Sequence, residues 1–169
     1  PLQLDANRYE KVYLGEEVVA PWVRPEADGS PRYQLPGRPG RPLPYLGYAP
    51  GAYLGRVVDQ LLKASRTPIH LDRVYETDMA EGLKVMALEG HGVAFLPQSA
   101  VRKEVRSRKL VSALGPESGP LEATMEIHAY RERPAAAASS AEGAGLAPRR
   151  AADALWAYLV QTGAERAPR

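Results

Sequence analysis

Three histidines are the residues in this sequence best suited to metal or acid–base chemistry. His70, His91 and His128 are scattered along the chain, at a predicted strand start, a turn and an exposed strand face. A metal site would need two of them at helical or hairpin spacing, with a carboxylate close by. The chain has no cysteine, which excludes thiolate ligands, disulfides and cysteine nucleophiles. We therefore expect no metal site.

Enzymatic motifs are missing from the sequence as well. No phosphate-binding loop, dinucleotide-binding glycine pattern or serine elbow follows a predicted strand. Gly90-His91-Gly92 is most simply a helix end and a tight turn, because no nucleophile is indicated for the histidine to activate. An enzyme would need an acid–base pair at the strand ends, where only Glu76 and Asp78 are available. We expect neither catalysis nor a cofactor.

A cluster of basic residues on a short predicted helix could touch phosphate groups. Glu104 interrupts the cluster, and no aromatic residue is interleaved to stack on bases. The net charge of +2 is also a weaker basic bias than a DNA-binding domain usually has. A solvated helix face is therefore favoured. The cluster consists of Arg102, Lys103, Arg106, Arg108 and Lys109.

Thr77 and Asp78 stand where a predicted strand ends and a helix begins. Asp78 can cap that helix while Glu81 reaches back, as in a variant capping box. The threonine hydroxyl can likewise cap the helix, or it can donate to a ligand anion that also receives the free backbone N–H groups of the helix start. Asp78 would repel an anion, which favours a neutral effector or a capping role alone. Both interpretations stay open.

The elements that must position these residues alternate between strands and helices. Extended runs at 11–14 and 18–23 are broken at Gly15, and the proline-rich segment 24–42 is expected to be a long loop. Apolar residues then recur at strand or helix spacing. The predicted order is a strand at 44–48, a helix at 53–62, a strand at 69–75, a helix at 79–87, a strand at 93–96, a helix at 99–105 and an extended segment at 110–114.

The apolar positions also predict which side chains are buried. On the helix at 79–87 the buried stripe is expected to contain Met79, Leu83, Met86 and Ala87, with Gly90 as its left-handed end. Alternation in 121–131 predicts a strand with one apolar face: Leu121, Ala123, Met125, Ile127 and Ala129. The final helix is expected to bury Ala152, Leu155, Trp156, Leu159 and Val160 and to fray after Thr162.

Strand–helix alternation in the middle of the chain implies an α/β fold with a parallel sheet covered by helices. In such folds, ligands bind beyond the carboxyl ends of the strands. The candidate ligand-binding residues at those ends are Tyr48, Thr77, Asp78 and Phe95.

The sequence from Val74 to Pro97 carries a more specific pattern. A strand and a capped helix are followed by Gly90-His91-Gly92-Val93-Ala94-Phe95-Leu96-Pro97. This segment resembles the effector-binding domain of LysR-type transcriptional regulators. Tyr53 to Asp59, the strand that ends at Tyr130-Arg131 and the last helix with Trp156 match the family's order, so the resemblance covers nearly the whole chain.

The resemblance implies a two-lobed fold similar to the type 2 periplasmic binding proteins, with an effector cleft between the lobes. Residues 1–15 would end the first lobe and cross the hinge, and 16–114 would form the second lobe. Residues 115–133 would return through the hinge, 134–148 would be a flexible loop, and 149–169 the C-terminal helix and tail. One lobe would be largely complete and the other only partial. The chain begins without methionine, and we expect it to be a fragment.

Within the family, the sequence is similar to the hypochlorite-responsive regulators, which are activated through methionine oxidation. The stretches that carry this similarity are Tyr45-Leu46-Gly47-Tyr48, Tyr53-Leu54-Gly55-Arg56 and Met79-Ala80-Glu81-Gly82-Leu83-Lys84. Met79 and Met86 lie in the matching region and are the candidate redox-sensing residues. Sulfoxide formation would make a buried apolar side chain polar, at a cost of about 1–3 kcal/mol.

Together these observations predict the sensing domain of a cytoplasmic LysR-type regulator. Its partners would be a small-molecule effector or oxidant, further copies of itself in a dimer or tetramer, and DNA only through an absent winged helix-turn-helix. No apolar run approaches the ~20 residues that span a bilayer, so no membrane partner is expected. The alternative is a solute-binding protein of a transport system with the same fold.

Overall fold

The computed structural model describes residues 4–133 and 146–166 of the chain. Two compact units are distinguished: a sheet unit, Glu17–Met125, and a terminal unit, Pro1–Glu16 with Glu126–Arg169. Two long strands, β1 (Tyr9–Val23) and β6 (Ala123–Glu132), contribute residues to both units and pair with each other.

The sheet unit contains a mixed sheet with the strand order β3-β2-β4-β1-β5. Strand β2 (Leu43–Tyr48) pairs in parallel with β3 (Leu71–Thr77) and with β4 (Val93–Pro97). Strand β1 runs antiparallel to β4 and to the short β5 (Val111–Ser112). The predicted parallel arrangement of the middle strands is confirmed. The predicted strand–helix alternation did not extend to β1. Because no helix connects β1 to β2, the sequence pattern did not determine whether β1 is parallel or antiparallel to its neighbours.

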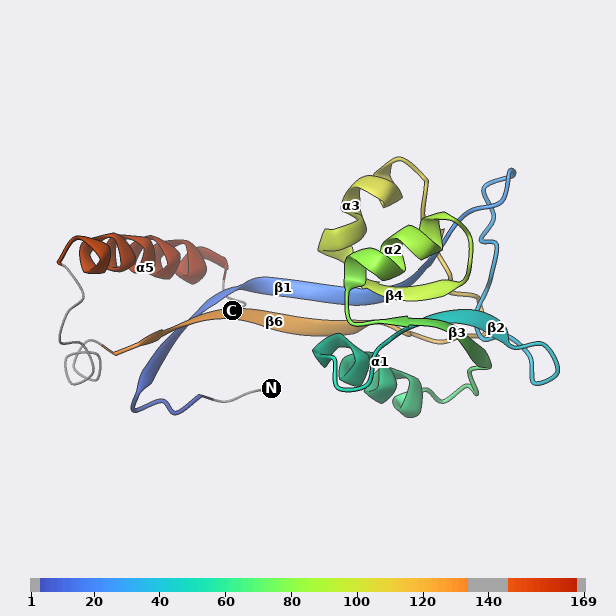
Figure 1. Ribbon diagram of the computed structural model, residues 1–169, viewed down its shortest axis with the longest axis horizontal. Helices are drawn as coiled ribbons and strands as arrows, with labels where there is room; N and C mark the ends of the chain where they lie inside the picture. Colours follow the sequence, from blue (N-terminus) through green and yellow to red (C-terminus); the bar gives the residue numbers. More distant parts are fainter. Residues whose placement is uncertain (1–3, 134–145, 167–169) are drawn as a thin grey trace. The chain divides into compact units, whose positions relative to one another are not determined.

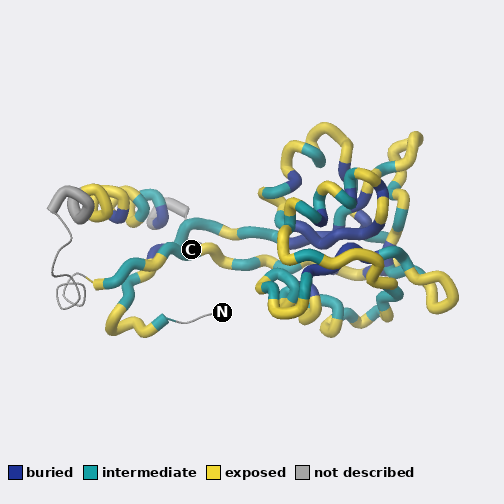
Figure 2. Tube along the Cα trace, viewed as in Figure 1, coloured by how far each residue is buried: buried dark blue, intermediate teal, exposed yellow. Residues whose placement is uncertain are grey.

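Three helices cover the sheet and leave its middle strands buried. Figure 1 shows α1 (Tyr53–Ala64) on one face, with α2 (Ala80–Leu88) and α3 (Gln98–Arg106) on the other. Because β4 is covered from both faces, its segment Val93–Leu96 is fully buried, and Figure 2 shows this interior as the darkest part of the unit. The predicted α/β class is confirmed, and the predicted helices agree with the observed ones to within a few residues.

Gly90 ends α2 as predicted, with a φ of +83° that favours glycine. The start of α2 differs from the prediction. Met79 is its N-cap residue, in extended conformation, and the side chain is 61% exposed. The helical repeat does not apply to an extended residue, so the prediction that Met79 belongs to the buried stripe was wrong. Leu83 and Ala87 are buried, and Met86 packs against the core.

Strand β1 is continuous from Tyr9 to Val23, whereas a break was predicted at Gly15. The glycine is accommodated at a φ of +148° without ending the strand. In β6 the predicted alternation holds as far as Glu126. Beyond it Ile127 is 41% exposed and His128 is half-buried, so the buried face changes where the chain enters the terminal unit.

In the terminal unit, α5 (Leu146–Arg166) buries fewer side chains than predicted. Trp156 is buried and Leu159 half-buried, whereas Ala152, Leu155 and Val160 are exposed. The Trp156 ring lies 4.7 Å from the Arg131 guanidinium, which also pairs with Glu10 and, at 3.0 Å, with Asp153. The helix begins at Leu146 and extends beyond Thr162. Residues 134–145, the greater part of the predicted flexible loop, lie outside the described residues.

Candidate functional site at the carboxyl ends of the parallel strands

The carboxyl ends of β2, β3 and β4 meet at one edge of the sheet unit. Tyr48 and Thr77 are register partners on adjacent strands, and the Ala49 N–H donates to the Thr77 carbonyl at 2.9 Å. On the other side of β2, Leu46 is the register partner of Ala94, the residue before Phe95. The parallel pairing therefore brings the predicted strand-end residues to neighbouring positions, as their spacing in the sequence indicated.

Tyr48 supplies the most unusual polar group at this edge. The residue is 3% exposed, and its hydroxyl is buried without a hydrogen-bond partner among the described residues. Burial raises the pKa of Tyr48 well above its ordinary value, because the phenolate would lose its hydration. Buried polar groups are nearly always paired in folded proteins, so an unpaired hydroxyl points to a functional role or to strain.

Thr77 and Asp78 lie on the surface between β3 and α2. The Thr77 Oγ1 accepts a hydrogen bond from the Met79 N–H at 3.3 Å. No side chain caps α2, so the prediction that Asp78 caps this helix was wrong. Glu81 does not reach back either; its carboxylate pairs with Lys84 at 2.8 Å. Asp78 is exposed, and its side chain makes no hydrogen bond or ion pair with any described residue.

Phe95 lies inside the sheet unit behind this edge. Its side chain is fully buried and makes an edge-to-face contact with Tyr45, with 6.3 Å between the ring centroids. The ring belongs to the core cluster that also contains Tyr48. In the described structure, therefore, Phe95 is placed to support the strand ends from within, and its ring is not at the surface.

A carboxylate is held at the start of α3, the helix that follows β4 directly. Glu17 accepts hydrogen bonds from the Ser99 N–H at 3.2 Å, from the Ser99 hydroxyl and from the Val18 N–H at 3.0 Å. A helix start attracts anions through its free N–H groups. Glu17 already satisfies one of these groups in α3. The sequence carried no signal of this contact, because the two residues are far apart in the chain.

The remaining candidate residues lie elsewhere. Met79 follows Thr77 at the same edge, while Met86 is half-buried within α2. The basic residues on and after α3 are exposed, as expected of a solvated face. His128 lies in the terminal unit, where its ring contacts Tyr13. The described residues contain no group of three or more side chains able to hold a metal ion, and no described helix is long and apolar enough to cross a membrane.

Comparisons with known proteins agree with this fold. The family model of the LysR substrate binding domain matches residues 6–161. The HTH-type transcriptional regulator YjiE of Escherichia coli is 31% identical over 103 residues, 61% of this chain and 33% of that protein. The HTH domain-truncated transcriptional regulator QseD of another Escherichia coli strain is 35% identical over 68 residues, 40% of this chain and 28% of that protein. The matched regions thus span about a third of these relatives.

A solved structure gives the same result for the fold. Full-length HypT from Salmonella typhimurium, described as a hypochlorite-specific LysR-type transcriptional regulator, superposes with a TM-score of 0.71. The superposition covers 96% of this chain and 50% of that chain at 24% sequence identity, which shows the fold alone. Because the family model covers nearly the whole chain, this protein belongs to the LysR substrate-binding domain family, the effector-binding regulatory part of transcription regulators and not an enzyme family.

Proposed function

We propose that the edge formed by Tyr48, Thr77 and Asp78 is the part of this regulatory domain that senses the effector. The observation that carries the proposal is the buried, unpaired hydroxyl of Tyr48, a residue whose backbone is the register partner of Thr77 at the carboxyl ends of parallel strands. Ligands of open α/β sheets bind at this position. Phe95 supports the edge from the core. Residues 16–114 would then be the second lobe of a two-lobed receptor, with the effector cleft on this edge.

The charges at this edge favour a neutral, hydrogen-bonding effector. Asp78 presents an exposed carboxylate, and the Glu17 carboxylate is bound at the start of α3. An anionic ligand would meet repulsion from both groups. The Tyr48 and Thr77 hydroxyls can each donate and accept a hydrogen bond. An uncharged polar molecule is therefore the chemistry that this edge supports best.

We further propose that the domain responds to hypochlorite through a methionine. This proposal is supported by the similarity to HypT, which is described as hypochlorite-specific. In the reaction, hypochlorous acid transfers its oxygen atom to the thioether sulfur. The sulfur is oxidised to the sulfoxide by two electrons, while chloride and a proton leave.

Met79 and Met86 would respond differently to this oxidation. The exposed Met79 side chain is easily reached, but its sulfoxide would remain in water and cost little. Met86 packs against the core, and burying its sulfoxide without a partner would cost about 1–3 kcal/mol. A free energy of that size shifts a two-state equilibrium by about 5- to 150-fold. We therefore assign the switch to Met86. Met79 is the more accessible of the two, and its oxidation should have little effect on the fold.

The test uses the complete regulator, since DNA binding and assembly into a dimer or tetramer are proposals for the whole protein. Hypochlorite-treated protein is mapped for sulfoxide by mass spectrometry, and promoter binding is measured in parallel. Met79→Leu should leave the DNA-binding response intact, whereas Met86→Leu should abolish it. Met125→Leu is the matched control, because Met125 also packs against the core of the sheet unit but lies on β6. An unchanged response in Met79→Leu/Met86→Leu would exclude both residues.

The effector edge is tested separately with Tyr48→Phe, which removes only the unpaired hydroxyl. The folded domain should be as stable as the parent, because no hydrogen bond is lost. In the complete regulator, promoter control by the effector should be weakened. Tyr53→Phe, on an exposed tyrosine of α1, is the control. A normal effector response in Tyr48→Phe would remove the observation on which the assignment rests.

A further inference from the structure

A concave surface lies at the opposite end of the same strands. It is formed by the loop 32–44 and the turn at 116–117 of the sheet unit, and its volume is about 660 Å³. Leu43 and Pro44, at the start of β2, form part of its wall, whereas Tyr48 ends that strand. Five residue steps of about 3.3 Å separate Leu43 from Tyr48, roughly 16 Å. We call this surface the arginine pocket.

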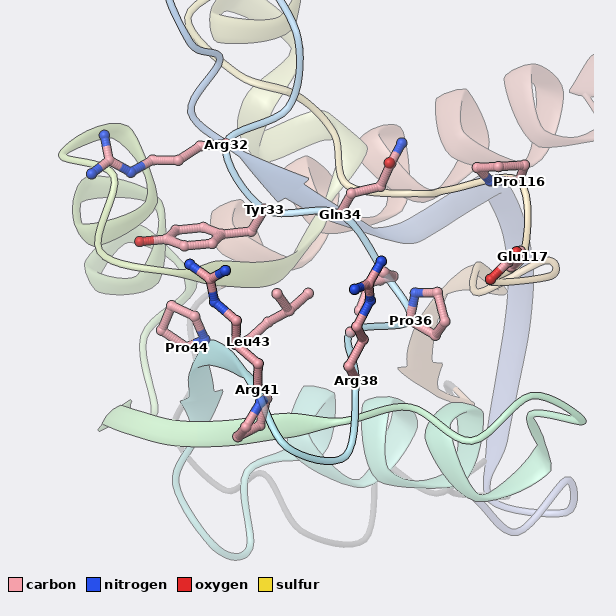
Figure 3. A pocket seen from close by; sticks show the side chains of 13 residues that line it. Arg32, Tyr33, Gln34, Pro36, Arg38, Arg41, Leu43, Pro44, Pro116 and Glu117 are labelled. Carbon is pink, nitrogen blue, oxygen red and sulfur yellow. The ribbon is translucent and has the colours of Figure 1, made fainter.

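The arginine pocket carries a strong excess of positive charge. Arg32, Arg38 and Arg41 line it, and Glu117 is its one acidic residue. Figure 3 shows Arg38 and Arg41 extending from their turn toward the segment that carries Tyr33. Neither arginine makes an ion pair or a side-chain hydrogen bond with any described residue. Arg32 forms a distant pair with Glu26 at 3.9 Å and lies over the Tyr33 ring, 5.8 Å from its centroid. The charges of Arg38 and Arg41 are thus available to a ligand.

Backbone contacts hold the wall of the arginine pocket in place before any ligand binds. The buried Leu35 donates its N–H to the Ala113 carbonyl at 2.9 Å, and the Pro36 carbonyl accepts from the His70 N–H at 2.8 Å. Gly37 has a φ of +75°, and an added Cβ would lie 2.6 Å from the His70 carbonyl oxygen. The Arg38–Arg41 turn is closed by the Arg41 N–H, which donates to the Arg38 carbonyl at 3.0 Å. A preformed wall reduces the entropic cost of binding.

We propose that the arginine pocket binds a small organic polyanion that carries carboxylate or phosphate groups. Guanidinium groups bind both groups through paired hydrogen bonds, and the volume is that of a metabolite-sized ligand. The concave shape favours such a compact molecule over the extended backbone of duplex DNA. The pocket lies at the other end of the strands from Tyr48. The proposal therefore goes beyond the sensing edge and does not depend on it.

The test is titration calorimetry of the complete chain with two probes, citrate and inorganic pyrophosphate, at an ionic strength fixed with sodium chloride. Saturable binding of one probe per chain is expected, and the preferred probe distinguishes a carboxylate from a phosphate ligand. Arg38→Gln and Arg41→Gln should each weaken binding by about tenfold, because each removes charge-assisted hydrogen bonds. Glu117→Gln should strengthen binding, because it removes the one repulsive charge of the pocket.

Arg102→Gln is the matched control, since it removes the same single charge as each pocket variant but from an exposed position on α3. Circular dichroism verifies that each variant is folded. Unchanged affinity in this control supports a specific pocket, whereas an equal loss in control and pocket variants would show non-specific electrostatics and overturn the proposal. Two further results would overturn it: no saturable binding of either probe, or binding of duplex DNA alone with the same dependence on Arg38 and Arg41.

Discussion

The buried phenol of Tyr45 predicts how the stability of the sheet unit falls at alkaline pH. The residue is 4% exposed, and burial raises the pKa of its phenol from 10.0 to about 12, with the nearby Arg73 guanidinium opposing this change. The folded state thus holds the phenolic proton more tightly than the unfolded state does. Stability from this group is complete below pH 10 and is lost as the pH rises toward 12, because the unfolded chain ionises first.

The size of the effect follows from the two pKa values of Tyr45. At about pH 11 the unfolded phenol is mostly ionised and the folded phenol mostly protonated, which lowers the free energy of unfolding by about 1.4 kcal/mol. The loss approaches roughly 2.7 kcal/mol above the folded pKa. Burial raises the pKa of Tyr48 in the same direction, so the parent protein should lose stability through both groups.

The assay is urea unfolding of the parent and of Tyr45→Phe at about pH 8 and about pH 11, with both samples unfolded reversibly. Phenylalanine keeps the ring beneath the Arg73 guanidinium, 5.5 Å away, and the contact with Phe95. Tyr45→Phe should therefore lose about 1.4 kcal/mol less than the parent between the two conditions. Tyr53→Phe, on a 55% exposed residue, should lose as much as the parent. Equal losses in the parent and in Tyr45→Phe would refute the argument.

Three further substitutions test the packing. Phe95→Ala should lower the free energy of unfolding by about 3–5 kcal/mol in urea titrations, since it empties a fully buried site; a loss below about 1 kcal/mol would contradict the burial. Gly92→Ala should cost about 1–3 kcal/mol, because its Cβ would lie 2.6 Å from the Pro44 carbonyl oxygen, and an unchanged melting temperature would disprove this close approach. Arg131→Gln should lower the free energy of unfolding by about 1–2 kcal/mol, because it removes the contacts with two carboxylates and with the Trp156 ring. An unchanged melting curve in far-ultraviolet circular dichroism would argue against a stabilising role for these contacts.

Local periodicity predicted much of the sheet unit. The apolar repeats of α1 and α2 and the buried run of β4 are short-range patterns, and each produced the expected element. The neighbouring positions of Tyr48 and Thr77 could be predicted too, because parallel strands place their carboxyl ends at one edge. Met79 was misplaced because an apolar residue at the right spacing lies just outside the helix, in extended backbone.

Other features depend on contacts that no local pattern contains. The hydrogen bonds from Ser99 to Glu17 join residues 82 positions apart. The arginine pocket arises from a loop whose prolines and glycines have no period, so only the folded backbone brings Arg38 and Glu117 to one concavity. The exposed face of α5 was also unpredictable, because Leu155 and Val160 are as apolar as the residues that the helix does bury.

At Gly15 the effect of backbone torsion can be distinguished from the effect of steric crowding. Gly15 has a φ of +148°, yet an added Cβ would meet no atom within 4 Å. A bulkier residue would therefore be opposed by backbone torsion alone and not by crowding. Since β1 passes from one compact unit to the other immediately after Glu16, a substitution at Gly15 would strain the backbone next to that boundary without creating a steric clash.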